Sequence, residues 1–191
     1  SGGSYYQVLQ DEKKVKTSEN KIAVVVARGT IMDGDQPPGT IGGDSTSRLI
    51  KNAYEDEAVK AIVLRINSPG GSALASDVIW RETILAKAEK PLVVSMGDLA
   101  ASGGYYIACA ADSIVANPTT LTGSIGVFGM IPNLKRFYKN KLGITFDTVN
   151  TSKYADMGIN RPLSNFERNK IQKSIEDIYS TFITRVSEGR N

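Results

Sequence analysis

The residue of this chain best placed to do chemistry is Ser102, which lies in a stretch made mostly of small residues. The stretch spans residues 95–106 and reads SMGDLAASGGYY. It follows an apolar run at residues 91–94, which predicts a short buried strand, and precedes an Ala-rich run at residues 107–111, which predicts a helix. Ser102 is therefore expected at a strand-to-helix turn, where a hydroxyl with small neighbours can serve as a nucleophile. A serine that opens a helix can also be an ordinary N-cap, so this turn alone leaves both interpretations open.

A second unusual turn, NSPGGS at residues 67–72, follows the apolar run at residues 61–66, which predicts another strand. The carboxyl ends of consecutive parallel strands meet at one edge of a sheet, so the two turns should be spatial neighbours. Gly70 and Gly71 leave backbone N–H groups uncovered at a helix start. One of these N–H groups and that of Gly103 would together form an oxyanion hole. A plain tight turn is the alternative interpretation.

The chain contains no histidine, which restricts the chemistry available to Ser102. A Ser-His-Asp triad, a Cys-His pair and a His-ligated metal are all excluded. The base would then have to be another group, and lysine is the usual remaining choice. A lysine acts as a base only when its amine is neutral, which burial favours by lowering its pKa. Lys153, in the loop after a predicted strand at residues 144–149, is the candidate within this chain; an exposed loop cation is the alternative.

Composition is that of an ordinary soluble domain. The chain has 191 residues, of which 41% are hydrophobic and 23% charged, with a net charge of +3. No basic stripe with interleaved aromatic residues is present, so nucleic-acid binding has little support, and no apolar run is long enough to cross a bilayer. Cys109 is expected to be a buried structural thiol. No metal and no cofactor are expected.

Strands alternate with helices along most of the chain, which predicts an α/β fold with a mainly parallel sheet flanked by helices. Residues 1–20 are interpreted as a tag remnant and a linker or arm, and residues 21–191 as one domain. The β-branched run at residues 22–27 predicts a first strand buried on both faces, and further strands are expected at residues 113–116 and 122–127.

Besides the helix at residues 107–111, helices are predicted at four places. The first spans residues 45–54, with Leu49 and Ala53 facing inward. The second spans residues 73–88, with an inward stripe of Leu74, Val78, Leu85 and Ala88. A short third helix at residues 132–141 ends at Gly143, a typical C′ glycine. The last opens at a capping box, Ser164 to Glu167, and carries Ile171, Ile175, Ile178, Phe182 and Val186 on one face.

Three segments together resemble the signal peptide peptidase A family, also called protease IV, of the Clp/crotonase superfamily. These segments are AIVLRINSPGGS at residues 61–72, AASGGYY at residues 100–106 and LTGSIGV at residues 121–127. They occur in order and at fitting spacing, and the resemblance spans roughly residues 22–186. It implies a Clp/crotonase-like ββα-superhelix fold and a serine endopeptidase that degrades signal peptides left after secretion.

The resemblance also implies roles for particular residues. Ser102 matches the nucleophile of a Ser-Lys dyad, and the N–H groups of Gly71 and Gly103 match the oxyanion hole. In short members of the family the lysine falls on Ala155, two residues beyond Lys153. In long members, built of two homologous halves, the lysine belongs to the amino-terminal half. This chain resembles the carboxyl-terminal half, without the family's final segment, so the lysine is expected to lie outside it.

The resemblance further implies a location and partners. The family is bacterial and anchored in the inner membrane, with its catalytic domain facing the periplasm; the anchor would precede this chain. Long members form tetramers, and the partners expected here are peptide substrates and further copies of the protein. Two other readings stay open: an assembly-forming half without activity of its own, and a crotonase-like acyl-CoA enzyme. A Clp-type protease is disfavoured because its triad needs histidine.

Overall fold

The strands with regular apolar residues form one parallel sheet. The computed structural model describes residues 18–190. In this sheet β1 (Lys21–Arg28), β4 (Val59–Ser68), β5 (Leu92–Ala101) and β6 (Ser113–Val115) lie side by side in that order, and β7 (Leu121–Gly123) also pairs with β5. A smaller parallel pair joins β2 (Ile31–Met32) to β3 (Ile41–Gly42). The predicted α/β class with a mainly parallel sheet is confirmed, whereas the interpretation of residues 1–17 lies outside the described residues.

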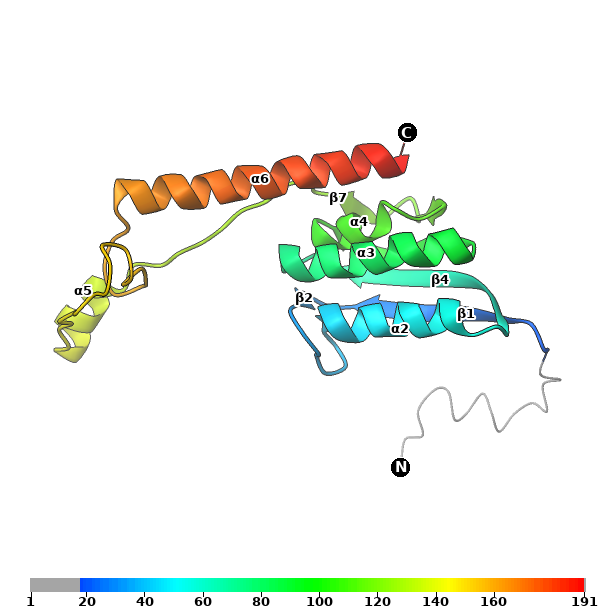
Figure 1. The fold of residues 1–191 in the computed structure, drawn as a ribbon, viewed down its shortest axis with the longest axis horizontal. Helices are drawn as coiled ribbons and strands as arrows, with labels where there is room; N and C mark the ends of the chain where they lie inside the picture. The colour runs from blue at the N-terminus through cyan, green and yellow to red at the C-terminus, as the bar shows by residue number, and fades with distance from the viewer. Residues whose placement is uncertain (1–17, 191) are drawn as a thin grey trace, which may run out of the picture.

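Helices cover one face of the main sheet. They are α2 (Gly43–Glu55), α3 (Ala73–Glu89) and α4 (Gly103–Ala108), each connecting one strand to the next (Figure 1). Fully buried strand residues such as Leu64, Ile66 and Val94 point into this layer and make the hydrophobic core. Cys109 lies in a second buried cluster at the end of α4, as expected, and its burial raises the pKa of the thiol to about 11.

The other face of the sheet is largely uncovered. Along β1 the side chains of Ile22, Val24 and Val26 are 67%, 58% and 52% exposed, while Val25 and Ala27 are buried. The prediction that β1 is buried on both faces is therefore wrong within the described residues. A run of β-branched residues satisfies the strand propensity of both faces, but only one face has a helix layer against it.

The inward stripe predicted for α3 is also wrong. Leu74 and Val78 are exposed, and the helix buries instead Ala75, Ser76, Ile79, Trp80, Thr83 and Ala86. The helix packs mainly against its neighbours α2 and α4, and the small Ala75 permits a close approach to Gly43 of α2. In α2, Ala53 is buried as predicted, but Leu49 is exposed and Ile50 takes the inward position.

Beyond the cleft described below, the chain leaves the core and forms a separate lobe, which we call the distal lobe (residues 131–164). It contains α5 (Lys135–Phe137) and a π-helical turn (Tyr138–Leu142), closed by Gly143 with the expected left-handed φ of +65°. No residue of the lobe is buried, and the strand predicted at residues 144–149 is not formed. The long helix α6 (Asn165–Arg190) then runs from the lobe back over α4 (Figure 1).

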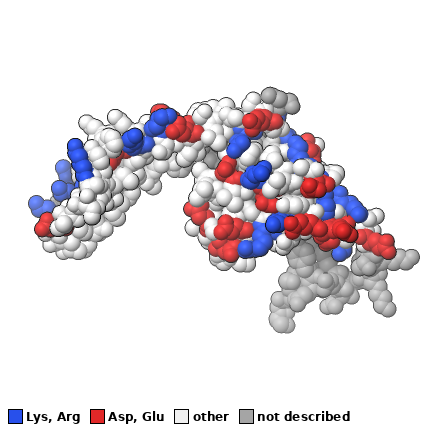
Figure 2. All heavy atoms as spheres, in the orientation of Figure 1, with Lys and Arg blue, Asp and Glu red and all other residues white. Residues whose placement is uncertain are grey.

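Charges of both signs are interspersed over the core surface, as Figure 2 shows for the face carrying α2 and α3. No patch of a single sign dominates this face, which agrees with the small net charge. The distal lobe and its connection to the core present mostly uncharged atoms in the same view.

Candidate active site

Ser102 lies between the end of β5 and the start of α4, in a strained backbone conformation. Its φ of +52° and ψ of −121° fall in a region that non-glycine residues rarely adopt. It is the residue preceding the helix, yet its side chain forms no capping hydrogen bond. The ordinary N-cap interpretation therefore does not fit. The half-buried hydroxyl is left available at the tip of a sharp strand-to-helix turn.

The two glycine turns touch, as predicted from the order of the strands. A Cβ built on Gly70 would lie 2.6 Å from the Gly103 nitrogen and 2.9 Å from the Ser102 Cβ. Gly70 has a φ of +97°, so both its conformation and its surroundings require glycine. Gly71, Ser102 and Gly103 line the same cleft, which has a volume of about 820 Å³.

Two backbone N–H groups in this cleft are not used by the rest of the chain. Ile31 pairs with the turn by donating to the Gly70 carbonyl (2.9 Å) and by accepting from the Ser72 N–H (2.8 Å). In this parallel bridge the Gly71 N–H faces away from Ile31. Gly103 begins α4, so its N–H has no intrahelical acceptor. Among residues 18–190 no hydrogen bond from either N–H is formed, and both can accept a new partner.

The remaining walls of the cleft are uncharged and largely apolar. Val127 and Phe128 come from the segment after β7, and Ile175, Ile178 and Phe182 from α6. None of the residues that line the cleft is an aspartate, glutamate, lysine or arginine. The cleft is therefore suited to an apolar ligand that is held mainly by backbone hydrogen bonds.

Lys153 does not line this cleft. It is exposed in the distal lobe, where its ammonium lies 5.5 Å from the centre of the Tyr154 ring, and that ring stacks on Phe166 at 4.3 Å. Figure 1 shows the lobe at the end of α6 remote from α4. The structure thus brings Ser102, Gly71 and Gly103 together but not Lys153, because the predicted strand that was to deliver it to the sheet is absent.

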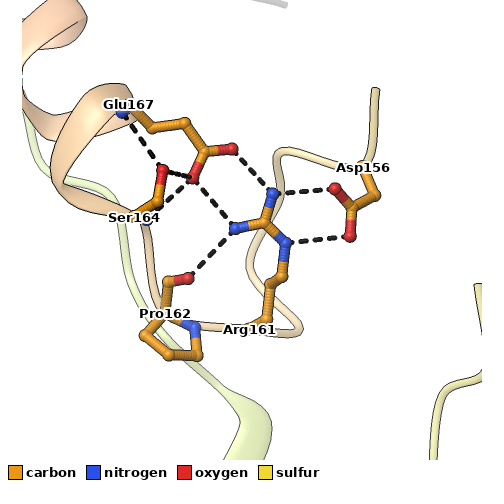
Figure 3. Close-up of polar contacts among 5 residues, drawn as sticks. All are labelled: Asp156, Arg161, Pro162, Ser164 and Glu167. Carbon is orange, nitrogen blue, oxygen red and sulfur yellow. Dashed lines mark hydrogen bonds and ion pairs between the residues drawn. The ribbon is translucent and has the colours of Figure 1, made fainter. Parts of the chain in front are cut away.

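An ion-pair network instead organises the segment around Lys153 (Figure 3). Arg161 donates to both carboxylate oxygens of Asp156, at 2.9 and 2.8 Å, and to both oxygens of Glu167, at 2.6 and 3.0 Å. Glu167 also accepts from the Ser164 N–H at 2.7 Å, which confirms the predicted capping box. Arg161 and these Ser164 hydrogen bonds lower the pKa of the Glu167 carboxyl to about 2.

Two features of the cleft were not foreseen from the sequence. Ser124 is the second non-glycine residue with a positive φ among those described, and it lines the cleft directly after Gly123, whose carbonyl accepts from the Ser102 N–H at 2.9 Å. The sequence Gly-Ser-Ile-Gly at residues 123–126 is the signal that could have indicated a special turn at Ser124. Tyr106, also in the lining, donates to Asp77 at 2.6 Å, and burial raises the pKa of its hydroxyl well above the usual range.

Fold and site define an α/β protein with a strained serine at a strand-to-helix elbow beside unused backbone amides. The sequence profile of "Peptidase family S49" matches residues 84–191, more than half of the chain. The chain belongs to this family, and the expectation of a protease IV relative is confirmed.

Curated relatives carry protease names. The chain is 51% identical to "Protease 4" of Salmonella typhi over 170 residues, and 44% identical to "Protease 4" of Haemophilus influenzae over 187 residues. These matches cover 88% and 97% of this chain, but only 27% and 30% of the relatives. The chain therefore spans less than a third of their length. A ClpP1 mutant from Listeria monocytogenes matches in structure with a TM-score of 0.48 and 16% identity, covering 87% of this chain and 71% of the other.

Among residues 18–190, no helix is long and apolar enough to cross a membrane. The His, Cys, Asp and Glu side chains of the same residues form no group of three or more that could hold a metal ion.

Proposed function

We propose that this chain is the nucleophile-bearing part of a serine endopeptidase that cleaves apolar peptides such as spent signal peptides. The observation that carries the proposal is the strained, uncapped Ser102 placed beside the unused N–H groups of Gly71 and Gly103. A hydroxyl held in a costly conformation, with donors converging on the same cleft, is typical of acyl-transfer sites. Membership of a peptidase family supports the same reaction.

The proposed reaction proceeds through an acyl-enzyme. The Ser102 oxygen attacks the peptide carbonyl carbon while its proton passes to a neutral amine. The carbonyl oxygen becomes an oxyanion and accepts hydrogen bonds from Gly71 and Gly103. Collapse of the intermediate expels the amine product of the peptide, which takes the proton from the ammonium group of the base. The base, again a neutral amine, then deprotonates a water molecule, which hydrolyses the ester and releases Ser102.

We assign the base to a lysine outside this chain. None of the residues lining the cleft is basic, and Lys153 is exposed in the distal lobe. The relatives are more than three times as long as the matched region, so their remaining sequence offers room for such a residue. Burial on docking against the apolar cleft would lower the lysine pKa, as the role requires.

Assembly with other copies is part of the proposal. Large apolar side chains are exposed on the distal lobe and the segment leading to it, among them Phe128, Met130, Phe146 and Val149. Exposed apolar surface of this extent usually marks an interface. A tetramer, anchored to the bacterial inner membrane by a preceding segment and facing the periplasm, is the arrangement implied by the family resemblance.

The competing readings differ in what they require of the cleft. An acyl-CoA enzyme of the crotonase type would need a catalytic carboxylate, and none of the lining residues carries one. An assembly-forming half without activity has no need for strain at Ser102. The cleft therefore favours the peptidase.

Hydrolysis of an apolar fluorogenic peptide tests the proposal. The chain is assayed alone and mixed with the amino-terminal half of the protein, with Ser102→Ala and Lys153→Ala variants of the chain as controls. Activity only in the mixture, lost in Ser102→Ala and kept in Lys153→Ala, is the expected result. Activity that survives Ser102→Ala contradicts the assignment of the nucleophile, and activity that disappears in Lys153→Ala places the base in this chain.

A further inference from the structure

The Gly70-Gly71 turn is tied to its surroundings by a side chain that lies outside the cleft. Asp33 follows β2, is exposed, and accepts a hydrogen bond of 2.5 Å from the Ser72 hydroxyl. Asp33 is not among the residues that line the cleft, whereas Ser72 is. The contact joins two segments 39 positions apart in the sequence and needs an explanation beyond local turn formation.

Ser72 connects this contact to the first turn of α3. Its hydroxyl oxygen accepts from the Ala75 N–H at 3.2 Å while it donates to Asp33, so both functions of the hydroxyl are used. The Ser72 carbonyl in turn accepts from the Ser76 hydroxyl at 2.7 Å. A bond to a carboxylate is stronger than one between neutral groups, so Asp33 is the firmest support in this series.

The first turn of α3 also contacts Gly103, which carries the second N–H group of the proposed oxyanion hole. Ser76 is buried, and its hydroxyl lies 2.5 Å from the position that a Cβ on Gly103 would take. The first turn of α3 therefore touches both donors: Ser72 is bonded covalently to Gly71, and Ser76 packs against Gly103. A shift of this turn changes the separation and direction of the two N–H groups together.

The turn requires such support because its backbone is permissive. Gly70 and Gly71 have φ values of +97° and +155°, in regions that only glycine occupies readily, and glycine has many alternatives there. Ile31 fixes the Gly70 carbonyl and the Ser72 N–H, which hold the backbone on one side only. The Asp33 bond fixes the side chain of Ser72 and removes a remaining freedom of rotation next to Gly71.

We infer that Asp33 is a positioning residue for the oxyanion hole, acting through Ser72 and the first turn of α3 on the N–H groups of Gly71 and Gly103. The inference rests on the proposed function, since it presumes that these amides receive an oxyanion. It predicts that loss of Asp33 weakens binding of the tetrahedral state more than binding of the unreacted peptide.

The test compares Asp33→Ala with Asp33→Asn, which keeps an acceptor, and with Asp35→Ala as a matched control. Asp35 lies in the same loop and pairs with Arg48 at 2.6 Å, away from the turn. The probe is a peptide aldehyde, which forms a tetrahedral adduct with serine, and the reference is the corresponding unreactive peptide amide. Binding of both is measured in the active mixture of this chain with the amino-terminal half, together with the amide proton shifts of Gly71 and Gly103.

Asp33→Ala is expected to weaken aldehyde binding about tenfold, the effect of one charge-assisted hydrogen bond, without changing the affinity for the amide. The Gly71 proton should move downfield on adduct formation, less so in Asp33→Ala. Asp33→Asn should retain most of the affinity, and Asp35→Ala all of it. In the active mixture, kcat should fall by a similar factor with KM unchanged.

Other outcomes overturn the inference. Equal losses for aldehyde and amide, or equal losses in Asp33→Ala and Asp35→Ala, mean that Asp33 has only a structural role. A wild-type chain that binds the aldehyde no better than Ser102→Ala refutes the proposed nucleophile, and this inference with it. Strong aldehyde binding that depends on Ser102 but not on Asp33 refutes this inference alone.

Discussion

Different kinds of interaction stabilise the core and the distal lobe internally. The core buries a continuous apolar layer between the sheet and helices α2, α3 and α4, and it positions Ser102 through backbone contacts. The distal lobe has no buried residue, and its best-defined feature is the ion-pair network around Arg161. The serine and the backbone amides of the proposed site lie together in the core. Lys153, the candidate base within this chain, is exposed in the lobe.

The comparison shows which functions a folded segment can perform alone. Precise placement of main-chain donors requires a packed core, because backbone positions are fixed by what surrounds them. Exposed apolar side chains such as those of the lobe usually mark an interface, as we propose for this protein.

The largest effect is expected for Ser102→Ala. Removal of the nucleophile should reduce hydrolysis by at least about a thousandfold in the active mixture. The melting temperature should stay nearly the same, because the hydroxyl caps nothing and the φ of +52° is equally strained for alanine. Hydrolysis rates and a thermal melt check both parts. A large drop in the melting temperature would show that the serine serves the fold of the core.

Gly70→Ala tests whether the core positions the site by direct backbone contact. The new Cβ would meet the Gly103 nitrogen at 2.6 Å, so the two turns must separate, and hydrolysis should fall about a hundredfold. Gly39→Ala is a close control: its φ of +99° matches the +97° of Gly70, but a Cβ there meets nothing within 4 Å. Both variants should lose some stability from positive φ, and only Gly70→Ala should lose activity. Equal activities of the two variants would show that the close contact between the two turns is not needed for catalysis.

Phe182→Ala should loosen the attachment to the core of α6, the helix that follows the distal lobe. Phe182 is 3% exposed, and its ring lies 4.8 Å from that of Tyr106, so α6 is fastened to the core at this point. Truncation of a buried Phe costs about 3–5 kcal/mol of unfolding free energy. Urea titration gives the loss, and hydrogen exchange should show faster opening of α6. Phe166→Ala, at an exposed position of the same helix, should cost far less.

Glu167→Gln should affect only the junction between the distal lobe and α6, and mainly above about pH 4.5, where the wild-type carboxylate is ionised. The pKa of Glu167 is lowered from 4.5 to about 2, so its stabilisation is fully present above about pH 4.5 and is lost as the pH falls toward 2. Amide signals of residues 156–167 should shift over this range in the wild type. The Gln variant should lack that transition, while Glu176→Gln, an exposed change on α6, should keep it. An unchanged transition in Glu167→Gln would assign it to another carboxylate.

Local signals in the sequence predicted more of the core site than of the lobe. The glycine-rich turns at residues 67–72 and 98–104 were placed together correctly, because strand order alone determines where they meet. The capping box at Ser164 and the C′ glycine at Gly143 were correct because each depends on a few adjacent residues.

Features that depend on distant partners were not predicted. The inward face of α3 was wrong because the helix packs mainly against α2 and α4, so the side that it buries depends on where those helices lie. The strand at residues 144–149 was wrong because no neighbouring strand lies there to pair with it. Strain at Ser102 and the bond from Asp33 to Ser72 arise from tertiary structure alone, and propensity contains no signal for either.

The contact between Gly70 and Gly103 also limits how such a protein can diversify. Main-chain amides are common to every residue, so point mutations have little means of adjusting the donors themselves, and a larger residue at Gly70 is excluded by the 2.6 Å approach. Val127, Phe128 and Ile175 face the same cleft without that restriction. Inherited variation can therefore accumulate in the walls while the donors stay constant, which allows descendants of one ancestor to acquire new preferences without reinventing the reaction.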